Sequence, residues 1–60
     1  MDTRKEEIIE LATRRFSHYG FAKTTMNEIA DDVKITKANL YYYYPDKNAL
    51  IKDVVSSISD

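Results

Sequence analysis

Only two residues in this chain readily break a helix, and they limit which elements it can form. Gly20 is the single glycine and Pro45 the single proline among 60 residues. They divide the chain into segments of roughly 19, 24 and 15 residues. Strands in a small domain need turn residues between them, whereas helical spacing of apolar residues recurs in every segment. We therefore predict an all-α fold, a small bundle of about four helices.

The composition narrows the class of protein. Apolar residues make up 43% and charged residues 32%, with no cysteine and one histidine. This balance is typical of a globular domain and excludes both a disulfide framework and a Cys/His zinc module. The longest apolar run, 40–44, is far below the roughly 18 residues of a membrane span, and no secretory signal is visible. We expect one soluble, cytoplasmic domain over 1–60, with no membrane partner, cofactor or metal.

The order of the charges is more informative than their sum of −1. Residues 11–27 and 33–45 contain lysines and arginines but no acidic residue, while acids are concentrated at 6–10 and 28–32. A binding field depends on where charge lies. The near-neutral total therefore hides two basic stretches suited to an anionic partner.

The first expected helix begins at Thr3, which has the capping-box spacing with Glu6. Gly20 is expected to end it in the left-handed conformation, and Phe21 to pack back on the same core. Helical spacing predicts one apolar face made of Ile8, Leu11, Ala12, Phe16 and Tyr19.

A second helix is expected to begin at Thr24 or Thr25, because Thr25 and Glu28 again have the capping-box spacing. Its buried stripe follows the i, i+3, i+4, i+7 pattern: Met26, Ile29, Ala30 and Val33. A third helix begins at Thr36. It must end near Tyr44, because a residue before proline is pushed out of the α region.

Only Lys34 and Ile35 separate these two helices, and so tight a turn forces a steep crossing. The geometry predicted for about 25–44 is a helix-turn-helix. After Pro45, Asp46 can cap a fourth helix with a broad apolar face, part of which has no expected partner here: Leu50, Ile51, Val54, Val55 and Ile58.

The third helix has two different sides. Leu40, Tyr43 and Tyr44 cluster on one side and are expected to face the core, Tyr43 only in part. The other side is centred on Ala38 and Tyr42 and flanked by Lys37, Asn39 and Tyr41. Such a side suits the DNA major groove, because asparagine pairs bidentately with adenine and lysine donates to guanine.

Other polar groups suit phosphate rather than bases. The tyrosine hydroxyls of Tyr41 and Tyr42 can donate to phosphates, which fixes position without reading sequence. The helix starts at Thr25 and Thr36 offer unpaired N–H groups at the positive end of a helix dipole. Lys47, just after the turn, can hold the same DNA strand.

Two blocks of the sequence stand out, GFAKTTMNEIA at 20–30 and TKANLYYYYPDKNAL at 36–50. Both resemble the DNA-binding domain of the TetR family of transcriptional repressors. The resemblance implies that the helix at about 36–44 reads the major groove. It further implies that Lys37, Ala38 and Asn39 lie nearest the bases, whereas other positions mostly touch phosphates: Tyr41, Tyr42, Tyr43 and Lys47.

The sequence departs from the family pattern at three positions. Lys34 stands in the turn where the family usually has glycine, so a left-handed backbone there costs about 1–2 kcal/mol unless the turn is of another type. Ala38 replaces a frequent glycine and improves helix propensity. Tyr44 replaces a usual phenylalanine, and its hydroxyl needs a partner if it is buried.

Family members continue into a helical domain that dimerises and binds a small molecule, and we expect that domain to be absent from this chain. The resemblance then implies a homodimer, a double-stranded and palindromic operator, and an effector bound elsewhere. No residues converge as a catalytic set, since His18 has no partner residues of a triad, so we expect no enzyme. The alternative is a helical protein-interaction module that uses the exposed tyrosines.

Overall fold

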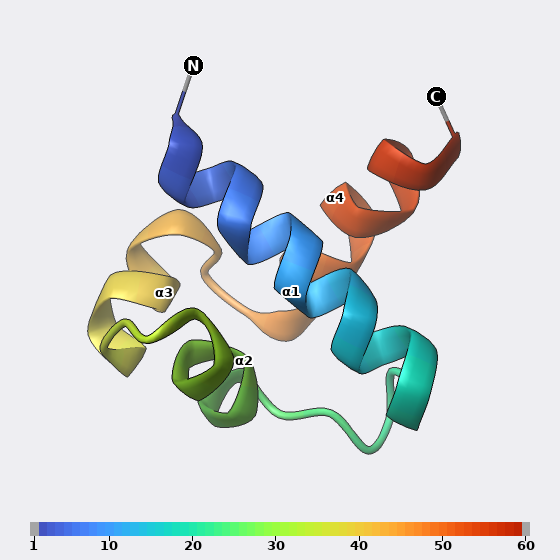
Figure 1. Cartoon of the computed structure of the whole chain (residues 1–60), viewed down its shortest axis with the longest axis horizontal. Coiled ribbons are helices and arrows are strands. Elements are labelled where there is room, and N and C mark those ends of the chain that lie inside the picture. Colours follow the sequence, from blue (N-terminus) through green and yellow to red (C-terminus); the bar gives the residue numbers. More distant parts are fainter. Residues whose placement is uncertain (1, 60) are drawn as a thin grey trace.

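The computed structural model describes residues 2–59, and this part of the chain contains helices but no strand. The helices are α1 (Thr3–Tyr19), α2 (Met26–Val33), α3 (Lys37–Tyr43) and α4 (Lys47–Ser59). Figure 1 shows α1 crossing the middle of the domain, with α2 and α3 on one side and the C-terminal half of α4 on the other. The predicted all-α fold is confirmed. None of these helices is long and apolar enough to cross a membrane.

The cap of α1 differs from the prediction. Asp2 is the N-cap, and its Oδ1 accepts from the N–H groups of Arg4 at 3.1 Å and Lys5 at 3.4 Å. Thr3 is already the first helical residue, so the expected capping box between Thr3 and Glu6 is wrong. The physical reason is that Asp2 is also a strong N-cap and brings a negative charge to the positive end of the helix.

The other end of α1 brings two further corrections. Gly20 has φ 91° and ψ 160°, a positive φ but not the left-handed conformation that we predicted, and its N–H donates to the Phe16 carbonyl at 2.8 Å. The chain leaves the helix extended, into the loop that leads to α2. Tyr19 is not on the core face, since 53% of it is exposed and its ring lies 5.1 Å from the Arg15 guanidinium carbon.

One apolar core joins the four helices. It contains all of the predicted stripe of α2 and the inner residues of the others: Ile8, Ala12, Phe16, Met26, Ile29, Ala30, Val33, Leu40, Tyr44, Leu50 and Val54. Phe21 packs back on it as expected, with its ring edge-on to Phe16 at a centroid distance of 4.9 Å. The helix α1 contacts both α2 and α4, and α2 in turn contacts α3.

The turn between α2 and α3 is held by backbone hydrogen bonds. Lys34 is left-handed, with φ 65° and ψ 44°. Its N–H donates to the backbone carbonyl of Asp31, and the N–H of Ile35 donates to the backbone carbonyl of Ala30. This pairing is that of a Schellman motif. The turn is therefore of the type that favours glycine, although a lysine occupies the position.

The fourth helix begins as predicted, because the Asp46 carboxylate accepts from the N–H of Ala49 at 2.8 Å. Leu50 and Val54 are buried against α1, whereas Val55 is 45% and Ile58 67% exposed. The apolar face of α4 is thus only half covered within residues 2–59.

Candidate nucleic-acid interface

The two sides of α3 are as different as the sequence predicts. Leu40 is fully buried, which fixes the rotation of the helix. The opposite side faces solvent and carries five of the predicted site residues: Lys37, Ala38, Asn39, Tyr41 and Tyr42. Within residues 2–59 no side-chain hydrogen bond or ion pair uses the ends of Lys37 or Asn39. These groups are therefore held in place by the backbone of α3 but keep their donors and acceptors for another molecule.

The four consecutive tyrosines, 41–44, differ in exposure, and the first three lie at the surface or are half-buried. Tyr42 is 82% and Tyr41 39% exposed, while Tyr43 is half-buried with its ring edge-on to Tyr42. Burial raises the pKa of Tyr43, helped by the nearby negative charge of Asp2. The phenol of Tyr43 therefore remains a protonated donor near neutral pH.

Tyr44 belongs to the core, and its buried hydroxyl has a hydrogen-bond partner. It donates to the Asp53 carboxylate of α4 at 2.6 Å. Burial, with this hydrogen bond, raises the pKa of Tyr44 well above its usual range. The contact ties the end of α3 to α4, and α3 is thereby positioned from both of its neighbours.

The N-terminus of α3 is closed by Thr36, whose Oγ1 accepts from the Asn39 N–H at 3.0 Å. In this cap the hydroxyl oxygen acts as an acceptor. The hydroxyl hydrogen remains the group through which Thr36 can donate to phosphate.

At the start of α2 the predicted capping box is present in full. The Glu28 N–H donates to Thr25 Oγ1 at 3.2 Å, and the Thr25 N–H donates to Glu28 Oε1 at 2.9 Å. That backbone hydrogen bond is the main reason why the pKa of Glu28 is lowered. The next two N–H groups, of Met26 and Asn27, belong to the first turn and have no acceptor within an α-helix.

Arg15 is occupied inside the domain and is not a candidate for phosphate. Its Nε lies 2.6 Å and its second terminal nitrogen 3.0 Å from the two Asp32 oxygens, a bidentate pair between α1 and α2. Glu28 lies 3.6 Å from the remaining nitrogen. The hydrogen bond to Asp32 raises the pKa of Arg15. Two of the three acids of α2, Glu28 and Asp32, are thus paired with one arginine of α1.

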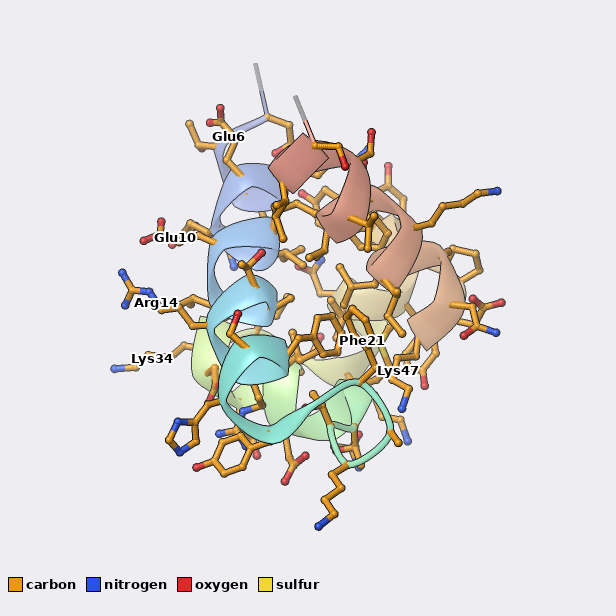
Figure 2. The ribbon with its side chains drawn as sticks, turned by 90° about the vertical axis from the view of Figure 1, so that its right-hand side faces the viewer. Glu6, Glu10, Arg14, Phe21, Lys34 and Lys47 are labelled. Carbon is orange, nitrogen blue, oxygen red and sulfur yellow. The ribbon has the colours of Figure 1, made fainter. Side chains whose placement is uncertain are left out.

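Lys47 has partners that sequence reasoning did not predict. Its ammonium donates to the carbonyl oxygens of Phe21 at 2.7 Å and Thr24 at 2.9 Å, both in the loop before α2. Figure 2 shows Lys47 beside Phe21, while Lys34 projects from the opposite side of the domain. One signal was available in the sequence, since a lysine in the first turn of a helix faces the positive end of the dipole and needs compensation.

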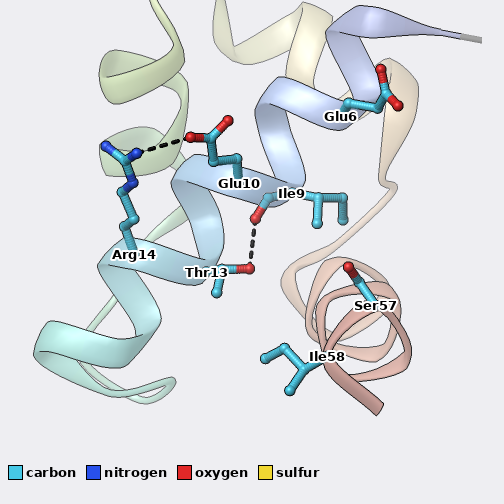
Figure 3. Close-up of a pocket in the computed structure, with 7 residues that line it drawn as sticks. All are labelled: Glu6, Ile9, Glu10, Thr13, Arg14, Ser57 and Ile58. Atoms are coloured by element: carbon cyan, nitrogen blue, oxygen red, sulfur yellow. Dashed lines mark hydrogen bonds and ion pairs between the residues drawn. The ribbon is translucent and has the colours of Figure 1, made fainter. Parts of the chain in front are cut away.

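An open groove between α1 and the end of α4 contains none of the predicted site residues (Figure 3). Ile9 and Ile58 give it an apolar floor, and the ion pair of Arg14 with Glu10, at 2.9 Å, lies on its rim. The candidate interface on α3 is therefore separate from this groove.

Comparisons with known proteins identify the family. Residues 8–54 match the family described as "Bacterial regulatory proteins, tetR family". The chain is 37% identical over 60 residues to the HTH-type transcriptional regulator RutR of Escherichia coli K12, covering 100% of this chain and 28% of the relative. It is 34% identical over 50 residues to the probable acrEF/envCD operon repressor of the same strain, covering 83% and 23%.

A third relative is the uncharacterized HTH-type transcriptional regulator YerO of Bacillus subtilis 168, 41% identical over 51 residues, or 85% of this chain and 18% of that one. The chain thus spans about a quarter of the length of the curated relatives it matches. No solved structure matches. Because the family match covers most of the chain and agrees with the helix-turn-helix built by α2 and α3, this chain belongs to the tetR family of bacterial regulatory proteins.

Proposed function

We propose that this chain binds double-stranded DNA and that α3 lies in the major groove. The observation that carries the proposal is the outer side of α3, whose polar groups point to solvent while Leu40 and Tyr44 anchor the helix from behind. The family and the names of the relatives favour DNA-binding regulation of transcription over the alternative of a protein-interaction module.

Three neighbouring residues at the start of α3 are assigned to base reading. Asn39 pairs with adenine through its amide, and Lys37 donates to guanine. Ala38 has only a methyl group, which allows the helix backbone to approach the bases and suits contact with the methyl of thymine.

The remaining site residues are assigned to the phosphate backbone. Tyr41, Tyr42 and Tyr43 donate phenolic hydrogens, and Lys47 contributes charge. The start of α2 after Thr25 and the start of α3 at Thr36 belong to the same helix-turn-helix and are assigned to phosphate as well. These contacts fix the register of α3 without specifying sequence.

The activity of the whole regulator belongs to the same proposal. We propose a repressor that acts as a homodimer on a palindromic operator, with a further domain that dimerises and binds a small effector. Two copies of the helix-turn-helix then bind two half-sites on one face of the DNA. The dimer therefore binds the operator more tightly than a single copy binds one half-site. A cytoplasmic location follows for a protein that acts on the bacterial chromosome.

The test is selection of bound sequences from a random duplex library, with the chain held as a dimer by a fused coiled coil. We expect a recovered palindrome, whose half-site contains adenine and guanine at neighbouring positions. A salt series on the selected duplex should give a negative slope of about 0.9 per phosphate contact in log K against log salt. No enrichment, together with a flat salt response, would overturn the proposal in favour of a protein partner.

A further inference from the structure

The loop between α1 and α2 is fastened from a distance, by the first residue of α4. Lys47 is partly buried, and its ammonium lies within hydrogen-bond distance of two carbonyl oxygens of this loop, those of Phe21 and Thr24. No other side chain of residues 2–59 donates to this loop from another helix. Within this described part of the chain, the lysine is thus the one polar tie between α4 and the segment that enters α2.

The loop itself is built to present those carbonyls. Thr24 is fully buried, and its hydroxyl donates to the Gly20 carbonyl at 2.8 Å. The Thr24 N–H turns back toward the Phe21 carbonyl at 3.4 Å. The chain between Gly20 and Thr24 is therefore folded on itself, and two of its carbonyls converge on a single cation.

The two carbonyl acceptors compensate Lys47 for an unfavourable place in its own helix. A cation in the first turn of a helix is opposed by the dipole of that helix. Two carbonyl oxygens at 2.7 and 2.9 Å offset this opposition. An ammonium has three donors, so one remains after both carbonyls are satisfied.

We propose that Lys47 is a positioning residue of the DNA interface: its ammonium clamps the loop carbonyls and thereby fixes the N-terminus of α2 against the start of α4. Thr25, which caps α2, directly follows the clamped Thr24. The N–H groups of the first turn of α2 are in this way held at a constant distance from the third donor of Lys47. The inference rests on the proposed function for its role toward DNA, whereas the clamp itself is a property of the free protein.

The clamp can be tested without DNA and without a substitution. Ammonium hydrogens that are held by carbonyls exchange with water more slowly than free ones, and nitrogen-detected NMR of lysine side chains measures this exchange. We expect the Lys47 ammonium to exchange at least about tenfold more slowly than that of the exposed Lys52 on the same helix. Equal exchange at the two lysines would overturn the proposal.

A matched pair of variants tests what the clamp holds. Lys47→Met removes the ammonium and keeps most of the stem, and Lys52→Met removes the same charge from the same helix. In Lys47→Met the amides of Thr24 and Thr25 should exchange about tenfold faster, while the amide of Tyr44 at the end of α3 keeps its rate. A uniform acceleration of all amides, or none, would show a merely structural or absent role and overturn the inference. If Lys47→Met does not fold, the ammonium measurement decides.

Measurements of DNA affinity separate the positioning role of Lys47 from the effect of its charge alone. Lys47→Arg keeps the charge and the donors, so loop protection and DNA affinity should both be retained, whereas Lys47→Met should lose both and Lys52→Met neither. A Lys47→Met variant that loses affinity with its loop amides unchanged would mean that the lysine acts only as a phosphate contact. Failure of the unaltered chain to bind any duplex would refute the proposed function and leave the result on the clamp intact.

Discussion

The two helices of the helix-turn-helix are nearly equal in length, but α2 buries many of its side chains and α3 exposes most of them. The helix α2, of 8 residues, buries Met26, Ile29, Ala30 and Val33. The helix α3, of 7 residues, buries only Leu40 within its bounds. Two acids of α2 are paired with Arg15 of α1, whereas the charged end of Lys37 on α3 has no ion-pair partner within residues 2–59.

The difference shows how so short a chain combines a core with a binding surface. The helix α2 buries half of its eight residues, whereas α3 is anchored by the fully buried Leu40 and, just after its end, by Tyr44. Under the proposed function, the exposed polar groups of α3 are the ones that contact DNA. The predictions below test this division of roles.

The largest effect is expected where α3 is anchored. Leu40→Ala removes a fully buried side chain and should reduce the free energy of unfolding by about 2–5 kcal/mol. A domain this small has little stability to lose, so the variant should be largely unfolded at room temperature. Urea denaturation followed by circular dichroism measures the change. The control is Tyr42→Ala on the outer side, 82% exposed, which should change stability by less than about 0.5 kcal/mol. Equal losses in the two variants would contradict a two-sided α3.

The next effect concerns recognition rather than stability. Asn39→Ala should weaken binding to the selected operator by about 1–3 kcal/mol and leave binding to random duplex unchanged, because only a base contact carries sequence information. Fluorescence anisotropy on both duplexes measures this difference. The fold should be preserved, since the backbone N–H of Asn39, not its side chain, donates to the Thr36 cap. An equal loss on both duplexes would assign Asn39 to the phosphate backbone instead.

The second anchor of α3 should contribute less than the first. Tyr44→Phe keeps the buried ring but removes the hydrogen bond to Asp53, at a cost of about 1.5 kcal/mol. The pH dependence has a definite sign. Because the pKa of Tyr44 is raised in the folded state, its contribution is complete below the unfolded pKa of about 10 and is lost as pH rises above it.

Chemical denaturation between pH 7 and pH 11 measures this contribution. The difference in stability between the unaltered chain and Tyr44→Phe should shrink at the alkaline end. Tyr42→Phe is the matched control, since that hydroxyl has no partner among residues 2–59 and its removal should leave the profile unaltered. A constant difference across the range would show that Tyr44 does not titrate as argued.

Most of the fold could be predicted from the sequence because the determinants are local. Apolar spacing identified every buried residue of α2, and the Thr25–Glu28 and Asp46 caps lie within one helical turn of what they cap. The errors occurred where two local choices compete. Asp2 and Thr3 are both good caps, and Tyr19 satisfies helical spacing at a point where the core has already ended.

The site could be predicted only in part. The outward side of α3 follows from the helical wheel once Leu40 is placed in the core. Contacts between distant segments do not follow from any local rule, and the bonds of Lys47 to the loop before α2 and of Arg15 to Asp32 are of this kind. Which bases face α3 depends on the DNA and remains a prediction.

The smallest expected effect lies in the turn that joins the two helices. Lys34 adopts the left-handed conformation with φ 65°, which is unfavourable for any residue with a Cβ atom. Its backbone completes the Schellman motif, so the conformation is required, while the side chain is exposed. Lys34→Gly should therefore raise the free energy of unfolding by about 1 kcal/mol, because the strain relieved exceeds the added entropy of the unfolded chain.

Lys34→Ala is the decisive control, because it removes the same charge but keeps the Cβ atom. Thermal denaturation of both variants should show stabilisation by glycine alone; equal stabilisation by alanine would attribute the gain to the lost charge, and the turn would then be unstrained.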